Sequence, residues 1–399
     1  MKARTVALRA GGIAAAVLFG IMAAINPGCR NTLSGPMQNQ TGTASALGKN
    51  SLRASQMTSL VANAASYNPV RTDANLTNAW GIAFNPNGIV WISANHSGLS
   101  VVYDQAGNQK RPPVSIPTHE DSTGGGAPTG IVFNPTTGFM IASTGEVSKF
   151  IFAQEDGIIS AWSSGNQAKI VADRSADDAV YKGLAMAWDG GQPFLYATNF
   201  KGGSVDVFDS HFQRVTNKPF MDPDIPAGFS PFGIQTVDGV LFVSYAMLKG
   251  PDNEDDQAGP GNGFIDVFST GGTLLRRFAS HGSLNSPWGI AQIPDEGFRN
   301  FGRGILVGDF GDGRINVFSR NGKFLGQLTD DSGTPITIPG LWGLSFGVPE
   351  SGHDEGNNEN DGDRGDQKLH RLFFTAGPND ESDGVFGTLD NTVSNREDD

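Results

Sequence analysis

The sequence of 399 residues contains a single cysteine, Cys29, and few charged side chains. One cysteine excludes an intramolecular disulfide and any zinc site built on several cysteines. Charged residues make up 17% of the chain, below the roughly 25% of an average soluble protein, and the net charge is −13. This excess of negative charge argues against nucleic acid or an anionic lipid surface as the partner.

Compact catalytic motifs and helical periodicity are also missing. The sequence has no Gly-x-Ser-x-Gly elbow, no His-Glu-x-x-His pair, no P-loop and no dinucleotide-binding fingerprint. Beyond the first 25 residues no segment repeats its apolar residues at a helical period. Apolar residues, at 38%, are nevertheless numerous enough for a core, and the 54 glycines are about twice the usual share.

The N-terminus predicts export. Residues 1–10 carry three bases and no acid, and residues 11–25 are small or apolar, as in a signal peptide. Cys29 follows this run at a position that resembles the acylated cysteine of bacterial lipoproteins, or it is lost with the cleaved peptide. Residues 30–57 are polar and glycine-rich and predict a flexible linker. We expect a periplasmic, outer-membrane-anchored or extracellular protein, with a lipid anchor as its sole membrane contact.

A phrase in which glycine precedes isoleucine or leucine recurs six times, at intervals of about 50 residues. Its occurrences are Trp80-Gly81-Ile82, Thr129-Gly130-Ile131, Lys182-Gly183-Leu184, Phe232-Gly233-Ile234, Trp288-Gly289-Ile290 and Trp342-Gly343-Leu344. A short apolar run and then an alternating run follow each phrase, as in FLYATN and GSVDVFD at 203–209. These runs are rich in β-branched and aromatic residues and are bounded by turn formers, which is typical of strands.

Six repeats with four strands each predict an all-β protein, a six-bladed β-propeller. A glycine before each first strand allows close packing near the central channel. The sixth repeat ends after its third strand, at Leu389, while residues 58–62 form a strand-like segment ahead of the first repeat. We therefore expect the N-terminal strand to complete the last blade and close the ring. The propeller would span 58–389, with a disordered acidic tail at 390–399.

The repeated phrases resemble NHL-type propellers and, more closely, an exported bacterial family of unknown function. The matching stretches include NAWGIAFNP, LYATNFKGGSVDVFDS and LFFTAGPNDESDGVFG, and the resemblance covers residues 59–389. Some members of that family end in a PEP-CTERM-type sorting tail, whereas this sequence ends in DNTVSNREDD. The resemblance implies the propeller fold and supplies no activity.

Ligands of propellers usually bind at the channel mouth on the top face, which carries the loops entering each first strand and those joining the second strand to the third. Four of the six residues before the repeated glycines are aromatic, and Lys182 and Tyr245 add a cation and a phenol to this face. We interpret the set either as a ligand-binding mouth for a sugar, lipid or planar molecule or as ordinary packing between blades. The candidate ligand-binding residues are Trp80, Lys182, Phe232, Tyr245, Trp288 and Trp342.

The loops between second and third strands bring oxygen-bearing side chains to the same face. Calcium prefers six to eight such oxygens, and propellers of the gluconolactonase type hold a divalent ion with Glu, Asn and Asp. That resemblance implies a site for Ca²⁺ or another divalent ion, and the alternative is that these residues are turn formers. The candidate metal ligands are Asn95, Glu155, Asn199 and Asp309.

His96, His119 and His281 are the candidate acid–base catalysts, because they also fall on top-face loops. Two acidic stretches, at 252–256 and 353–366, are either solvated insertions or, for the longer one, a weak calcium site. Neither follows the order of an EF-hand loop.

We expect a monomeric binding or scaffold protein whose top face recognises an extracellular glycan, small molecule or surface protein. The alternative is a divalent-metal-dependent hydrolase or lyase of the gluconolactonase type, with the ion at the channel mouth. A structural role in the cell envelope is a third hypothesis, favoured if Cys29 is acylated. The propeller fold does not decide between them.

Overall fold

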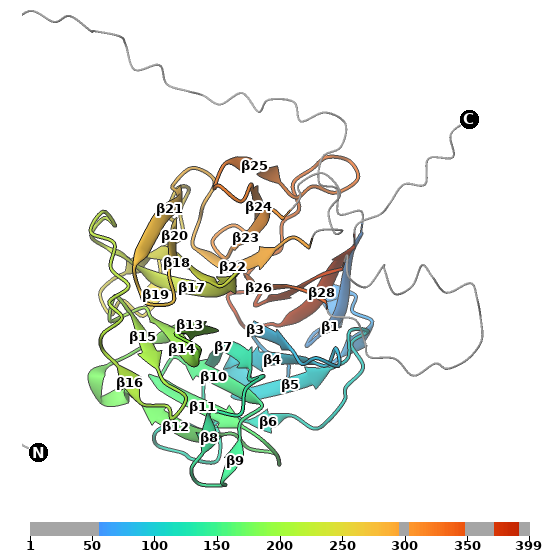
Figure 1. Ribbon diagram of the computed structural model, residues 1–399. Helices are drawn as coiled ribbons and strands as arrows, with labels where there is room; N and C mark the ends of the chain where they lie inside the picture. Colours follow the sequence, from blue (N-terminus) through green and yellow to red (C-terminus); the bar gives the residue numbers. More distant parts are fainter. Residues whose placement is uncertain (1–55, 295–302, 348–370, 391–399) are drawn as a thin grey trace, which may run out of the picture. The chain divides into compact units, whose positions relative to one another are not determined.

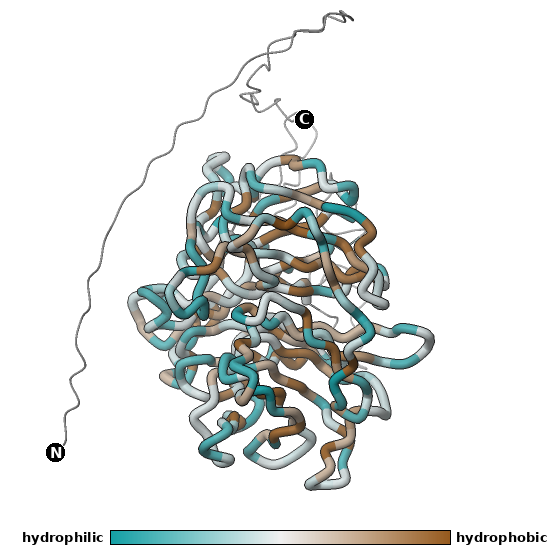
Figure 2. The backbone as a smooth tube through the Cα atoms, turned by 90° about the vertical axis from the view of Figure 1, so that its left-hand side faces the viewer, coloured by the Kyte–Doolittle hydropathy of each residue, from teal (hydrophilic) through white to brown (hydrophobic). Residues whose placement is uncertain are grey.

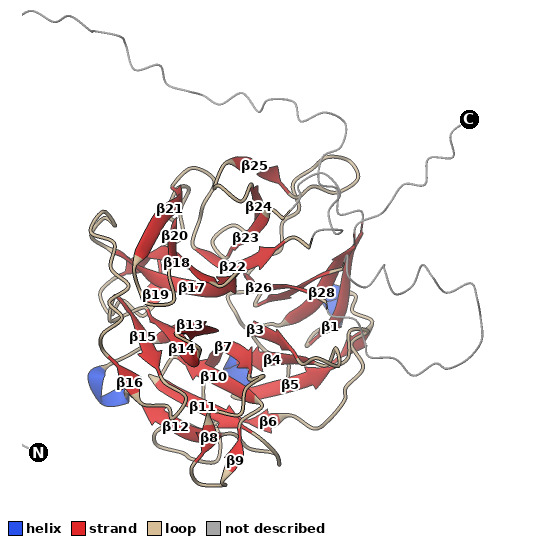
Figure 3. Ribbon diagram, in the orientation of Figure 1, coloured by secondary structure: helices blue, strands red, loops and turns tan. Residues whose placement is uncertain are grey.

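A computed structural model describes residues 56–294, 303–347 and 371–390 and shows six antiparallel sheets around a common centre (Figure 1). Within these ranges strands account for nearly all of the regular structure (Figure 3), and the helical segments are three single 3-10 turns. The innermost strand of each sheet is the one that begins with the repeated glycine phrase. The all-β, six-bladed propeller predicted from the repeats is confirmed.

Blades 1 to 3 each contain four consecutive main strands. Blade 1 consists of β3 (Ala79–Phe84), β4 (Val90–Ala94), β5 (Leu99–Tyr103) and β6 (Val114–Ser115). Blade 2 consists of β7 (Pro128–Phe133), β10 (Phe150–Gln154), β11 (Ile158–Trp162) and β12 (Lys169–Asp173), with a small hairpin of β8 (Met140–Ile141) and β9 (Glu146–Val147). Blade 3 consists of β13 (Tyr181–Asp189), β14 (Gln192–Asn199), β15 (Ser204–Phe208) and β16 (Arg214–Val215).

Blades 4 and 5 follow the same order. Blade 4 consists of β17 (Phe229–Val237), β18 (Val240–Lys249), β20 (Phe264–Phe268) and β21 (Leu274–Ser280), and β19 (Asp255–Asp256) pairs with the end of β18. Blade 5 consists of β22 (Pro287–Gln292), β23 (Ile305–Asp309), β24 (Ile315–Phe318) and β25 (Phe324–Gln327).

Blade 6 combines the two ends of the propeller. Its inner strands are β26 (Leu341–Phe346), β27 (Leu372–Ala376) and β28 (Val385–Asp390), and β1 (Gln56–Ala62) pairs antiparallel with β28 in a register that places Thr58 opposite Thr388. The short β2 (Arg71–Thr72) adds a parallel outer strand. Ring closure by the N-terminal strand is thus confirmed, and it starts two residues earlier than the sequence indicated.

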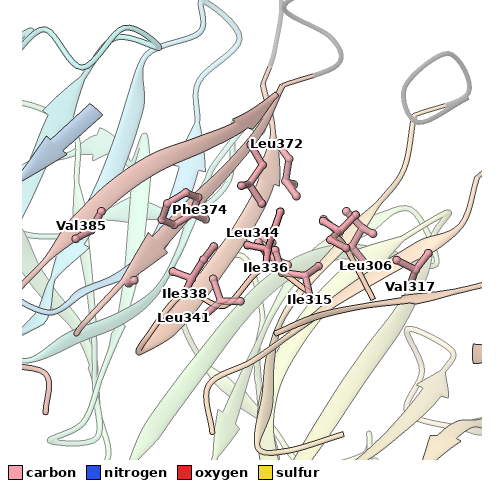
Figure 4. Packing of buried hydrophobic residues seen from close by; sticks show 14 of the residues in the cluster. Leu306, Ile315, Val317, Ile336, Ile338, Leu341, Leu344, Leu372, Phe374 and Val385 are labelled. Atoms are coloured by element: carbon pink, nitrogen blue, oxygen red, sulfur yellow. The ribbon is translucent and has the colours of Figure 1, made fainter. Parts of the chain in front are cut away.

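The core lies between neighbouring blades. Figure 4 shows the cluster that joins blades 5 and 6, where Leu306 and Ile315 lie close to Leu344 and Leu372. In Figure 2 the hydrophobic stretches of the chain run mostly through the interior, and many of the outer loops are hydrophilic. Each fully buried aliphatic or phenyl side chain stabilises the fold by about 1.5–3 kcal/mol, so the interfaces between blades hold the ring together.

The repeated glycines lie where neighbouring inner strands approach most closely. A Cβ atom on Gly81 would collide with the backbone oxygen of Thr129, and one on Gly289 with the backbone oxygen of Trp342. The close packing predicted for these glycines is therefore confirmed, and it draws the six inner strands together around the channel.

Several predictions fall outside the described residues. These are the signal peptide, Cys29, the linker except for its last two residues, the acidic stretch at 353–366 and the tail after residue 390. In the ranges that the structure does describe, no helix has both the length and the apolar character needed to cross a bilayer.

Candidate functional site

The six residues before the repeated glycines lie near the top ends of the inner strands, as expected. Their exposure differs from that of an open ligand-binding mouth. Trp80, Phe232 and Trp342 are each 1% exposed and Lys182 is 2% exposed, while Trp288 is only half-buried. Thr129 is fully buried and donates its hydroxyl hydrogen bond to the backbone of Tyr181.

Stacked aromatic rings close the top end of the channel. The rings of Trp80 and Trp342 are parallel with centroids 3.6 Å apart, and Phe310 stacks on Trp342 at 3.9 Å. Trp288 meets both tryptophans edge-on, at 6.3 and 5.9 Å. We call this group, completed by Phe200 and Phe232, the aromatic plug. Its members pack on one another, which is the packing interpretation that the sequence left open.

Phe200 and Phe310 belong to this plug although the sequence analysis did not select them. Both directly follow a second strand, in the pairs Asn199-Phe200 and Asp309-Phe310. The recurrence of Phe at that position in blades 3 and 5 was the available signal. Its meaning depends on the distance across the channel, which repeats alone do not give.

Lys182 forms the buried centre of the polar part of the site. Its ammonium group pairs with Glu155 of blade 2, lies 3.8 Å from Asp255 of blade 4 and sits 5.1 Å from the ring centroid of Trp80. Burial alone would lower the pKa of Lys182, but the charge of Glu155 and the hydrogen bond to it outweigh burial and raise that pKa. The same pairing holds the pKa of Glu155 below its usual range against the opposite effect of burial. Both groups are therefore charged at neutral pH.

A chain of amide side chains extends this ion pair across blades 1 and 6. Asn95 donates to Glu155 over 3.0 Å, and the side-chain nitrogen of Asn78 donates to Asn95 over 3.3 Å and to Glu381 over 2.6 Å. The Nε1 of Trp342 donates to Asn78 over 2.9 Å, which ties the network to the plug. Burial, followed by the charge of Glu155, raises the pKa of Glu381 to about 7. We call Asn78, Asn95, Glu155, Lys182, Asp255 and Glu381 the polar network.

The hydrogen bonds of the four candidate metal ligands lead to different partners. Asn95 and Glu155 are neighbours, but an ammonium group already contacts Glu155. Asn199 accepts backbone hydrogen bonds from Val180 and Gly202 instead. No group of three or more His, Cys, Asp or Glu side chains among the described residues is arranged to hold a metal ion.

Asp309 lies in the interior of blade 5, with one carboxylate oxygen hydrogen-bonded and the other buried without a partner among the described residues. Its carboxylate accepts a hydrogen bond from Asn316 over 2.6 Å, and the side chain is fully buried. Burial, followed by the negative charge of Asp312, raises the pKa of Asp309 well above its usual value.

The three candidate histidines occupy separate places on the top face, and all are exposed. His119 Nδ1 lies 2.6 Å from Asp173, and this hydrogen bond is the main cause of its raised pKa. His281 Nδ1 lies 2.8 Å from the backbone oxygen of Gly261. His96 follows Asn95 directly in the loop after β4, and its charge adds to the larger effect of Lys182 in lowering the pKa of Glu155 against burial.

Tyr245 is buried in blade 4 rather than at the mouth, and it is 4% exposed. Burial is the largest cause of its raised pKa, and Asp266 and Asp222 add to it. Its phenol therefore stays protonated and belongs to the interior of the blade.

Exposed acids surround the polar network on one side of the top face. The side chains of Asp178, Asp255, Asp177 and Glu254 are 75%, 69%, 55% and 50% exposed. We call these four residues the acidic patch. Lys201, largely covered, binds between Asp178 at 2.7 Å and Glu254 at 2.9 Å, and Arg174 pairs with Asp177 at 3.0 Å. Four acids thus face two bases of the surrounding loops, and the patch keeps a net negative charge.

No known family profile matches the chain. Two proteins of Acanthamoeba polyphaga mimivirus, each named only as an uncharacterized protein, are similar over most of their length. R648 is 33% identical over 333 residues, covering 80% of this chain and 76% of the relative. L690 is 31% identical over 332 residues, covering 79% of this chain and 81% of the relative.

Three solved structures illustrate the propellers that resemble this one. They are a soluble aldose sugar dehydrogenase of Escherichia coli (TM-score 0.49, 13% identity, 84% of this chain and 99% of that chain), a putative gluconolactonase (0.47, 14%, 79% and 89%) and virginiamycin B lyase of Staphylococcus aureus (0.45, 14%, 78% and 95%). These scores are too low to carry a conclusion about this chain.

Proposed function

This chain belongs to the same family as the mimivirus proteins R648 and L690. We propose that it is an exported binding module and that its top face recognises a positively charged segment of another protein. The observation that carries the proposal is the acidic patch beside a sealed channel. A ligand that approaches the top face meets exposed carboxylates beside aromatic rings that are stacked and buried. Carboxylates at this density favour lysine and arginine side chains.

Charge and position support a protein partner. The chain as a whole has a net charge of −13, which gives long-range attraction for a basic surface. The acidic patch comes from the loops of blades 3 and 4, which are fixed by the inner strands beneath them. A partner bound there would contact two neighbouring blades at once.

A glycan partner has less support. Sugar rings are held largely by stacking on exposed aromatic faces. Here the faces of Trp80 and Trp342 cover each other, and Trp288 is the sole half-exposed tryptophan of the plug. The glycan reading therefore serves as an alternative outcome of the experiment below.

The metal-dependent hydrolase also has less support than the binding module. In the described residues, the carboxylate that a divalent ion would need at the channel mouth, Glu155, is neutralised by Lys182. The other two proposed ligands point to their own partners. The residues present thus suit an internal ammonium group better than an added ion, and we derive no catalytic step through a metal.

Export remains part of the proposal and depends on residues 1–29. The basic start and apolar run support it, and Cys29 would decide between an anchored and a free protein. Secretion of the full chain, compared with a chain in which residues 11–25 are deleted, tests this part separately.

Fluorescence anisotropy with a labelled oligolysine peptide tests the binding proposal, with chitin and xylan oligosaccharides as glycan probes. We expect the triple variant D178N/E254Q/D255N to bind oligolysine at least about tenfold more weakly than the wild type. The matched control D104N/E146Q/D209N removes the same charge outside the top face and should stay within about twofold. Equal loss in both triples, or tight binding of a glycan alone, would overturn the proposal.

A further inference from the structure

A cavity opens at the end of the channel opposite the aromatic plug. It has a volume of about 290 Å³ and lies where the inner strands of five blades end. Its walls are formed by residues from β3, β7, β13, β17 and β26. The lining includes Phe84, Phe133, Met186, Gln235, Thr236 and Phe346.

The cavity is the wide end of the central channel, which is closed at its other end. Above it the channel narrows to a passage of about 40 Å³ lined by four of the six repeated glycines and by Ile131, Leu184 and Ile290. Beyond that passage Trp80 and Trp342 stack across the channel and are almost fully buried. A molecule that enters from the bottom face therefore stops inside the propeller and cannot pass through.

The walls of the cavity suit an uncharged molecule. In the part of the chain that the structure describes, the residues that line it include no Asp, Glu, Lys, Arg or His. The apolar walls come from phenylalanine, isoleucine and methionine side chains. Each inner strand is also the free edge of its sheet, so backbone N–H and C=O groups face the channel without a strand partner.

Polar side chains in the wall differ in whether they are already used. Thr236 donates its hydroxyl to the backbone oxygen of Met186 over 2.8 Å, and Ser345 donates to Phe346. The side-chain amide of Gln235 is exposed and makes no hydrogen bond to the residues that the structure describes. It is the one wall side chain with both a donor and an acceptor ready for a ligand.

We propose that this bottom cavity, between the ends of β3, β7, β13, β17 and β26, is a second binding site, which takes a neutral small molecule with an apolar body and a hydrogen-bonding group. Its volume is at the lower limit of about 300–1,000 Å³ that is usual for ligand pockets. The apolar body packs against Phe84, Phe133 and Phe346. The hydrogen-bonding group meets the amide of Gln235. The site is independent of the acidic patch, because the plug separates the two.

The neutral naphthalene dye prodan is a suitable probe, since it has an apolar ring system and a carbonyl acceptor and its emission shifts to the blue in an apolar site. We expect one saturable site per chain. Gln235→Trp, which fills the cavity, should weaken binding at least about tenfold, and Gln235→Leu, which keeps the size and loses the amide, by about threefold to tenfold. Gln192→Trp, on the same face but outside the cavity, should stay within about twofold.

Each contrary outcome overturns the proposal. Prodan binding that does not saturate would show dispersed adsorption to the surface. Equal weakening of prodan binding by Gln235→Trp and Gln192→Trp would show the same. Binding that appears only after residues 350–366 are deleted would show that the chain's own segment fills the cavity. Thermal melts of all variants establish that they fold, since Gln235 and Gln192 are both exposed.

Discussion

The ammonium group of Lys182 pairs with the carboxylate of Glu155 across the boundary between blades 3 and 2. The lysine side chain is only 3% exposed, so water screens this pair weakly. The same ammonium group faces Asp255 of blade 4 and the ring of Trp80 in blade 1. One side chain thus contacts three other blades at the top of the channel. Its ammonium group occupies the position in which a bound cation would contact the same two acids.

Replacing Lys182 should destabilise the propeller strongly. Lys182→Met leaves Glu155 buried without its counter-charge, and breaking a buried pair in this way costs about 3–5 kcal/mol. The double variant K182M/E155Q removes the uncompensated charge and should recover part of the loss. Urea unfolding of the full chain measures both.

Lys201→Met is the matched control for that experiment. Lys201 also pairs with two acids, but those acids are exposed, so the loss should be within about 1 kcal/mol. Equal effects of the two lysine substitutions would contradict the role assigned to Lys182.

The aromatic plug should behave as core. Trp342→Ala removes the ring that stacks on Trp80 and Phe310, together with the N–H that donates to Asn78. We therefore expect a loss of about 3–5 kcal/mol in the free energy of unfolding. Trp188→Ala, at a tryptophan that is 50% exposed, should change it by less than about 1 kcal/mol. A small effect at Trp342 would mean that the plug opens. It would then favour the interpretation of these rings as a ligand-binding mouth.

Glu381 should make stability depend on pH. Its pKa is raised from 4.5 to about 7 in the folded protein, so its contribution to stability is fully present below pH 4.5 and is lost as the pH rises through 7. Glu381→Gln does not titrate. The free energy of unfolding of the variant minus that of the wild type should therefore rise by about 2 kcal/mol between about pH 5 and about pH 8.

Unfolding curves of the two proteins at several pH values check this. Buried acids that do not interact with Glu381 titrate alike in both proteins and cancel in the difference. A difference that is flat with pH, or that grows in the wild type's favour, would contradict the environment described for Glu381.

The closing strand can be tested by truncation. A chain that starts at Asn63 lacks β1, so β28 becomes an open edge and the contacts of the fully buried Val61 and Ala62 are lost. We expect a melting temperature at least about 10 °C lower than that of a chain that starts at Ser51, together with association through the exposed edge. Equal melting temperatures for the two chains would show that β1 is dispensable.

The fold was readable from the sequence because the signal is repeated. Six glycine phrases fix the inner strands, and the missing last strand of the sixth repeat points to residues 58–62. Neighbouring strands pair locally within a blade, so their order along the chain gives their order in the sheet. Two-residue outer strands such as β16 show that the outer edges of blades depend more on context than the inner strands do.

The site was readable only in part, since it depends on contacts across the channel. That Asn95 and Glu155 share a face follows from their loops, and the structure joins them by a hydrogen bond. The partner of Lys182 could not be inferred, because the distance between neighbouring blades at the mouth is set by ring packing. For the same reason the sequence could not tell whether Trp80 and Trp342 stack on each other or face a ligand.

The pairing of Gln56 with Asp390 brings the two ends of the propeller side by side in one sheet. A short linker could therefore join them, and new ends could be cut into a loop of another blade, so the ring should tolerate circular permutation. It also follows that the whole propeller could be inserted into a loop of a host protein as a single cassette, entered and left at neighbouring points of one blade.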